Sequence, residues 1–233
     1  MPETEAHCIV VITAHPDDTE FMCGGSVAKW AAEGREVYYV VSTNGNKGSS
    51  DPEMTSERLA RIREQEQRDA AQVLGVKDVV FLGYGDGELQ DTMEYRGMLV
   101  KMLRTYRPDL VVTMDPYRQY FQHRDHRIAG IVTLDACYPY ARDYLHYPEH
   151  MKEGLQPHKV GEVFIGGSED ADVFIDIGET FERKVDALRC HVSQMGEGTR
   201  EEFIERMRNA FARNSGGQGS HTVEAFRRVR FNR

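Results

Sequence analysis

The chain has 233 residues, of which 40% are hydrophobic and 29% charged, and its formal net charge is −9. A chain of this length can bury a full core without disulfides or metals, and we expect residues 1–233 to form one domain. The acidic excess is spread along the chain, without clusters of Lys and Arg. We therefore do not expect binding to nucleic acid or to an anionic membrane surface.

The predicted elements alternate between strands and helices. The segment CIVVIT, residues 8–13, is a short β-branched apolar run, typical of a strand buried on both faces. In chain order there follow a helix at 26–32 after a glycine pair, a strand at 37–41, a helix from about 52 to 74, a strand at 79–82, a helix at 93–106, a strand at 110–114, a helix from 125 to about 136, strands at 163–165 and 173–177, and helices at 179–190 and 201–213. This alternation predicts a single-domain, Rossmann-like α/β fold with a mainly parallel sheet and helices on both faces.

Two stretches carry no clear helix or strand pattern. Residues 138–161 are rich in Tyr, His and Pro and predict an irregular excursion. Residues 214–220, NSGGQGS, predict a mobile loop that could serve as a lid or an interface.

The cysteines and the N-terminal residues bear on the location of the protein. The four cysteines form no C-x-x-C pair and no disulfide framework, which is typical of reduced thiols in a cytosolic protein. We find no secretion signal and no apolar run near the ~20 residues that span a bilayer. We therefore expect a cytoplasmic protein.

Polar side chains directly follow the first predicted strand, in the sequence Ala-His15-Pro16-Asp17-Asp18. Open α/β sheets bind ligands at the carboxyl ends of their strands. His15 and Asp18 can face the same side of a first helical turn, and an imidazole with a carboxylate is a familiar ligand pair for Zn²⁺ and related ions. Asp17 would then face the water on the open side of the metal and could accept a proton from it. A simpler possibility is that both Asp residues cap the next helix.

A second cluster, His123-Arg124-Asp125-His126, follows the fourth predicted strand. His126 is a candidate third ligand, because two His and one carboxylate leave an open position for water at a catalytic zinc. His123 could stabilise an oxyanion or donate a proton to a leaving group. Asp125 could orient one of the imidazoles. Alternatively, these are ordinary polar residues at a helix start.

With these two clusters, the sequence resembles the family of zinc-dependent N-acetylglucosaminyl deacetylases related to PIG-L and LmbE. The His15-Pro-Asp17-Asp18 and His123-x-Asp125-His126 motifs are the specific signals. The supporting motifs are Gly24-Gly25, Thr43-x-Gly45-x-x-Gly48, Arg63-x-x-Glu66, Leu74-Gly75, Gly85-Asp86-Gly87, Gly130, Ala187-Leu188, His191-x-Ser193-Gln194 and Glu224-Ala-Phe226-Arg227. Together they span nearly the whole chain in order.

The resemblance implies a metal-dependent hydrolase that removes the N-acetyl group from an N-acetylglucosamine-type sugar or conjugate. It implies one Zn²⁺ per chain, with Fe²⁺ or Co²⁺ as alternatives, and a homo-oligomer. Asp17 would be the general base, and His123 would stabilise the oxyanion and protonate the departing amine. The implied residues are His15, Asp18 and His126 for the metal, Asp17 and His123 for catalysis, and Arg63, Asp86, Asn46 and His191 for the substrate.

The chain departs from the family pattern at two places. Many members carry Glu where this chain has Asn46, which would alter the sugar that is accepted if the residue contacts substrate. Some members have a Tyr at the position of Phe121, so Tyr120 beside it is the candidate for any tyrosine contribution.

Other functions fit parts of the sequence. A metal-dependent phosphoesterase would keep the metal, but two-metal clusters usually need more carboxylate and His ligands than we find. A non-catalytic nucleotide- or anion-binding module is the third candidate, although no G-x-G-x-x-G follows the first strand and no P-loop occurs. Without the family pattern, Arg63 and Glu66 would be a surface pair at helical spacing.

Overall fold

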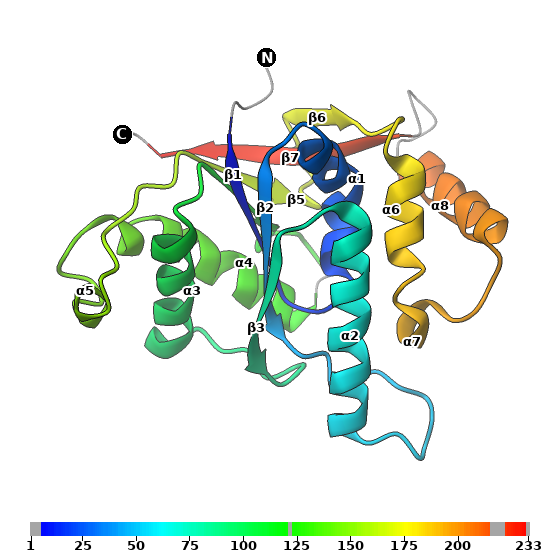
Figure 1. Ribbon diagram of the computed structural model, residues 1–233, viewed down its shortest axis with the longest axis horizontal. Coiled ribbons are helices and arrows are strands. Elements are labelled where there is room, and N and C mark those ends of the chain that lie inside the picture. The colour runs from blue at the N-terminus through cyan, green and yellow to red at the C-terminus, as the bar shows by residue number, and fades with distance from the viewer. Residues whose placement is uncertain (1–5, 121–122, 215–221, 232–233) are drawn as a thin grey trace.

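The computed structural model describes residues 6–120, 123–214 and 222–231, which form a sheet covered by helices on both faces (Figure 1). The strands are β1 (Cys8–Thr13), β2 (Glu36–Thr43), β3 (Asp78–Tyr84), β4 (Leu110–Met114), β5 (Glu162–Gly166), β6 (Val173–Asp176) and β7 (Val223–Arg230). The helices are α1 (Asp18–Ala32), α2 (Ser56–Leu74), α3 (Met93–Tyr106), α4 (Arg124–Cys137), the 3₁₀ turn η1 (Tyr140–Arg142), α5 (Glu149–Lys152), α6 (Phe181–Leu188), α7 (Val192–Met195) and α8 (Arg200–Asn214).

Within the described residues, the sheet has seven strands in the order β3-β2-β1-β4-β5-β7-β6. The first five are parallel, and β7 runs antiparallel between β5 and β6. Strand β1 pairs with β2 on one side and β4 on the other, so the chain reverses its direction of travel across the sheet at β1. Open α/β sheets form their ligand crevice at such a switch point, beyond the carboxyl ends of the strands.

The alternating side chains of β1 explain its continuous apolar sequence. Ile9 and Val11 pack into the core beneath α1, α2, α6 and α8. Val10 and Ile12 pack into a second core beneath α3 and α4. Figure 1 shows these two groups of helices on opposite sides of the sheet. The mainly parallel α/β fold with both faces covered is therefore confirmed.

Helix α1 begins at Asp18, so the start predicted at Ser26 is wrong. Its backbone is interrupted at Cys23, where φ is −147° and ψ is 19°, and the glycine pair that was placed before the predicted helix lies inside it. Gly25 is required by close packing, because a Cβ atom there would lie 2.5 Å from Cδ1 of Ile177. The helix continues past the break because side chains from distant segments form hydrogen bonds with its free backbone N–H and C=O groups.

A buried ion pair supplies the hydrogen bonds that the break in α1 removes. The Glu224 carboxylate, on β7, accepts from the backbone N–H groups of Gly25 (3.0 Å) and Ser26 (2.7 Å). The Nζ atom of Lys184, on α6, donates to the Phe21 carbonyl (2.8 Å) and to Glu224 (2.6 Å). Unpaired backbone groups are costly in a protein interior, so this pair stabilises the break. It also ties the first turn of α1 to α6 and β7.

Strand β7 and the start of α2 also differ from the prediction. Residues 223–226 of this strand alternate between partly buried and buried positions. The strand was not predicted because it includes Glu224 and three arginines, which break the apolar pattern. Helix α2 begins at Ser56 rather than near residue 52, because the Thr55 side chain accepts a hydrogen bond from the Arg58 N–H (3.2 Å) and caps the helix there.

The excursion at residues 138–161 has only η1 and α5 as regular structure, as predicted. Arg104 of α3 organises it: its buried guanidinium donates to backbone carbonyls that include those of Tyr147 (3.1 Å) and Asp143 (2.8 Å). The loop predicted at residues 214–220 lies almost entirely outside the described residues. All four cysteines are free, and no helix among the described residues is long and apolar enough to cross a membrane.

Candidate metal centre

Three predicted ligands from two distant segments meet at the carboxyl edge of the sheet. His15 follows β1, Asp18 begins α1, and His126 lies in the first turn of α4. The Asp18 carboxylate lies 3.3 Å from Nδ1 of His15 and 3.1 Å from Nε2 of His126. The two imidazole nitrogens are 3.2 Å apart. The contact to His15 is made by Oδ2 of Asp18 and the contact to His126 by Oδ1. Each distance is close to the ~3.4 Å between ligand atoms around a tetrahedral Zn²⁺ with bonds of about 2.1 Å, so the three side chains form a candidate site for a divalent cation.

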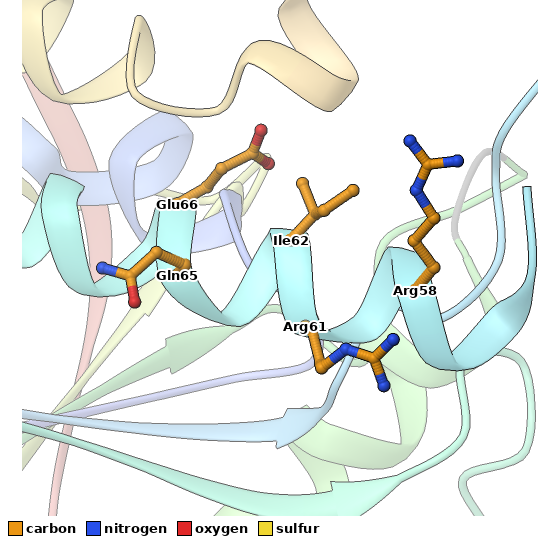
Figure 2. A pocket seen from close by; sticks show the side chains of 5 residues that line it. All are labelled: Arg58, Arg61, Ile62, Gln65 and Glu66. Carbon is orange, nitrogen blue, oxygen red and sulfur yellow. The ribbon is translucent and has the colours of Figure 1, made fainter.

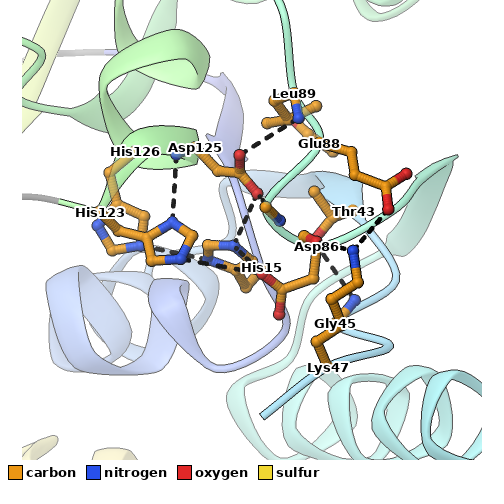
Figure 3. Close-up of polar contacts among 12 residues, drawn as sticks. His15, Thr43, Gly45, Lys47, Asp86, Glu88, Leu89, His123, Asp125 and His126 are labelled. Atoms are coloured by element: carbon orange, nitrogen blue, oxygen red, sulfur yellow. Dashed lines mark hydrogen bonds and ion pairs between the residues drawn. The ribbon is translucent and has the colours of Figure 1, made fainter. Parts of the chain in front are cut away.

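The charge around His15 also favours a cation. Its Nε2 atom lies 3.2 Å from Asp86 and 3.2 Å from Asp125 (Figure 3). Its Nδ1 atom faces Asp18. Burial would lower the pKa of His15, but its hydrogen bonds with Asp125, Asp18 and Asp86 outweigh burial and raise the pKa to about 11. Three carboxylates around one buried imidazole thus attract positive charge, which a divalent cation would supply.

Asp125 fixes the orientation of His15. Its side chain is completely buried and accepts hydrogen bonds from the backbone N–H groups of Gly87 (2.6 Å) and Leu89 (3.3 Å), besides its contact with Nε2 of His15. With Nε2 paired to this carboxylate, the Nδ1 atom of His15 faces Asp18 and His126. This is the orienting role that the sequence left open for Asp125.

Two other groups of side chains in the crevice are close enough to bind an ion. One is His15, Asp86 and Asp125, and the other is the three histidines. The first would need Nε2 of His15 and the Asp125 carboxylate as ligands. Both oxygens of the Asp125 carboxylate already accept hydrogen bonds from backbone N–H groups, so the geometry favours the opposite side of His15.

His123 lies at the exposed mouth of this cluster. Its Nδ1 atom accepts a hydrogen bond from the Asp125 N–H (3.2 Å), which caps α4. Its ring stands edge-on to that of His15, with the centroids 4.6 Å apart. Burial and the positive charge of His15 lower the pKa of His123. Because Nδ1 accepts, Nε2 carries the proton of the neutral ring and can donate it to a ligand.

Asp17 occupies the N-cap position of α1, but its side chain makes no capping hydrogen bond. Its backbone is in the left-handed region, with φ of 89°, which turns the side chain away from the helix. One carboxylate oxygen lies 3.4 Å from Nη2 of Arg63. Burial and the negative charge of Asp18 raise the pKa of Asp17 to about 7. Such a carboxylate is suited to act as a general base near neutral pH.

Arg63 is buried, so it is not half of a surface pair with Glu66. Its guanidinium donates to the carbonyls of Gly45 (3.1 Å) and Pro16 (2.8 Å) and thereby clamps the loop after β2 to the turn after β1. Gly45 has φ of +60°, and a Cβ atom there would lie 2.6 Å from the guanidinium. Arg63 therefore holds the turn that carries Asp17 and also contacts the Asp17 carboxylate.

Asn46 and Asp86 join two loops at the edge of the crevice. The Asn46 side chain accepts a hydrogen bond from the Asp86 N–H (3.0 Å), and the Asp86 carboxylate faces His15. Tyr120 is fully exposed, and Phe121 lies outside the described residues. Substrate contacts of Asn46 and Asp86 stay predictions.

His191 lies behind the site, not at its surface, so the structure offers no direct substrate contact for it. Its side chain is 0% exposed, and its Nε2 atom lies 3.1 Å from Glu20. Glu20 and Gln67, which contact each other there, were missed by the sequence analysis. For Gln67 the sequence contained an indication of burial, because Arg63, Glu66 and Gln67 occupy the buried face of α2 at helical spacing.

A hollow of about 540 Å³ lies along α2 and is lined by Arg58, Arg61, Ile62, Gln65 and Glu66 (Figure 2). All five residues belong to this one helix, and none is a candidate metal ligand. It is a groove on the surface of α2, distinct from the crevice at the sheet edge.

Fold and site define the class: an α/β protein whose mainly parallel sheet presents a His/Asp candidate cation site at its carboxyl edge. The family model PIG-L, described as GlcNAc-PI de-N-acetylase, matches residues 10–137, more than half of the chain. The chain belongs to this family.

Individual relatives agree with that membership. The chain is 33% identical over 200 residues to a diacetylchitobiose deacetylase of Thermococcus kodakarensis, covering 84% of this chain and 73% of the relative. It is 29% identical over 231 residues to a 1D-myo-inositol 2-acetamido-2-deoxy-alpha-D-glucopyranoside deacetylase of Mycobacteroides abscessus, covering 80% and 81%. The structure of an N,N'-diacetylchitobiose deacetylase from Pyrococcus horikoshii superimposes with a TM-score of 0.89 at 30% identity, covering 97% and 85%.

Replacing His126 by Ala is expected to lower the zinc content, because it removes one of the three predicted ligands, whose pairwise contacts are 3.1–3.3 Å. Zinc per chain is measured by emission spectroscopy after removal of loosely bound metal. His146→Ala is the matched control, since His146 is half-exposed and paired with Asp143. Unchanged stoichiometry in His126→Ala would remove His126 from the ligand set.

Proposed function

We propose that this protein is a zinc-dependent N-deacetylase that hydrolyses the acetamido group of an N-acetylglucosamine-type sugar or conjugate. The observation that carries the proposal is that His15, Asp18 and His126 meet next to Asp17, whose carboxylate makes no helix-capping hydrogen bond. The names of the relatives, which are deacetylases of acetylated amino sugars, support this substrate class.

The residues of the crevice suit amide hydrolysis. A divalent cation on the three ligands would act as a Lewis acid that polarises the amide carbonyl and acidifies water near neutral pH. Asp17, whose side chain makes no hydrogen bond to the first turn of α1, would take the proton from the attacking water. His123, with Nε2–H at the mouth of the site, would donate a hydrogen bond to the oxyanion. The proton that Asp17 takes from water would then pass to the departing amine. Asp125 and Arg63 would hold His15 and Asp17 in place.

A panel of N-acetylated sugars tests this function. Free N-acetylglucosamine, N,N'-diacetylchitobiose and sugar conjugates of inositol and malate are each scored for acetate and free amine. The assay is run before chelation, after it, and after readdition of Zn²⁺, Fe²⁺ or Co²⁺. We expect equal amounts of acetate and amine from at least one sugar, and only with metal present.

Two outcomes would contradict the proposal. Release of phosphate from sugar phosphates, without acetate from any amide, would favour a phosphoesterase. Binding of sugars or nucleotides with no bound metal and no turnover would favour a non-catalytic module.

A further inference from the structure

A line of buried side chains leads from Asp17 away from the proposed metal site. The Asp17 N–H donates to Oε1 of Gln67 (2.9 Å). Nε2 of Gln67 donates to both carboxylate oxygens of Glu20 (3.0 and 3.1 Å), and Nε2 of His191 lies 3.1 Å from Glu20. Gln67, Glu20 and His191 are all completely buried. A ligand in the crevice cannot contact them directly, and the hydrogen bond between Asp17 and Gln67 connects them to the crevice.

The backbone of Asp17 is one that needs support. An N-cap residue is usually extended, with its side chain bonded to the N–H groups of the first helical turn. Asp17 instead has φ of 89° and ψ of −28°, in a region that residues other than glycine rarely adopt. Such a conformation persists where surrounding contacts fix it. The hydrogen bond to Gln67 fixes the N–H group of Asp17.

Glu20 decides which end of the Gln67 amide faces Asp17. A backbone N–H can only donate, and an ionised carboxylate can only accept. One orientation of the amide therefore satisfies both neighbours, with its oxygen toward Asp17 and its nitrogen toward Glu20. Nε2 of His191 donates to Oε2 of Glu20, which Gln67 also contacts, and helps to hold the carboxylate in place.

The segment that carries His191 is itself anchored to α2. The Glu66 carboxylate, one residue before Gln67, accepts from the N–H (2.7 Å) and hydroxyl (2.6 Å) of Ser193. Helix α2 thus holds Asp17 through Gln67 and the segment that carries His191 through Glu66.

We propose that Gln67, Glu20 and His191 are positioning residues that hold Asp17 in its left-handed conformation and keep its carboxylate turned toward the reaction centre. The inference rests on the proposed function, in which Asp17 is the general base.

A reciprocal exchange tests the proposal. Gln67→Glu alone places a second carboxylate about 3 Å from Glu20 and should push the side chain at position 67 away from Asp17. Adding Glu20→Gln restores the pairing: the amide at position 20 donates to the carboxylate at position 67, whose other oxygen still accepts the Asp17 N–H. We expect Gln67→Glu to lower kcat at least about tenfold, with KM and zinc per chain little changed. The double variant should recover most of kcat.

Gln65→Glu is the matched control, since it makes the same change on the same helix at an exposed position. Figure 2 shows that the side chains of Gln65 and Glu66 leave α2 in different directions. A second readout does not need activity: hydrogen exchange of the Asp17 amide, measured by NMR. It should speed up at least about tenfold in Gln67→Leu, while amides of β1 keep their protection.

The outcomes separate the two proposals. Unchanged kcat in zinc-loaded Gln67→Glu, with Asp17→Asn inactive, would overturn the positioning role alone. Failure of the double variant to recover kcat, or unchanged exchange at Asp17 in Gln67→Leu, would also overturn it. Full activity in Asp17→Asn would overturn the proposed function and with it the inference.

Discussion

Asp17→Asn should abolish most of the deacetylase activity while the protein keeps its zinc. Asparagine has the same shape and can still accept a hydrogen bond from Arg63, but it cannot take a proton from water. General base catalysis contributes about 10²–10⁴ in rate, so we expect kcat to fall by about that factor. The measurement is acetate release at saturating substrate, together with zinc per chain.

The neighbouring substitution provides the control. Asp18→Asn makes the same chemical change one residue further along, at a proposed ligand, and should reduce zinc content as well as activity. Equal zinc loss in both variants would mean that Asp17 is itself a ligand. Full activity in zinc-loaded Asp17→Asn would exclude it as the base.

Lys184→Met should destabilise the protein strongly, because it leaves the buried Glu224 carboxylate without its counter-charge. The side chains are 0% and 2% exposed, and the charged atoms lie 2.6 Å apart. Breaking a buried pair by removing one partner costs about 3–5 kcal/mol. It also leaves the Phe21 carbonyl without its Lys184 donor at the break in α1. The free energy of unfolding is measured by urea titration of the metal-free protein.

Two further variants make this result specific. Adding Glu224→Gln removes the unpaired charge and should recover part of the lost stability. Lys101→Met is the control, since the pair of Lys101 with Glu153 is 41% and 49% exposed and such pairs contribute about 0–1 kcal/mol. Equal losses in Lys184→Met and Lys101→Met would show that the buried pair has no special role.

The sequence was sufficient for the parts of the fold that depend on local pattern. The β-branched runs of β1 and β4 predict strands buried on both faces, and their boundaries are confirmed at Cys8–Thr13 and Leu110–Met114. Helix α3 is confirmed at Met93–Tyr106, where Thr92 caps one end. Once these strands are parallel neighbours, the polar residues after each of them must meet at one edge.

The sequence was not sufficient where distant partners decide the structure. The continuation of α1 through Gly24 and Gly25 depends on Lys184 and Glu224, which lie far along the chain. The left-handed backbone of Asp17 likewise depends on Gln67, fifty positions away. No local pattern at the glycine pair or at Asp17 contains these partners.

Anomalous diffraction at the zinc edge, from crystals of the zinc-loaded protein, tests most directly whether one cation joins the two segments. We predict one strong peak per chain, within about 2.0–2.3 Å of Nδ1 of His15, a carboxylate oxygen of Asp18 and Nε2 of His126. A peak bound instead by Nε2 of His15 with Asp86 and Asp125, or no peak in the crevice, would contradict the proposed centre.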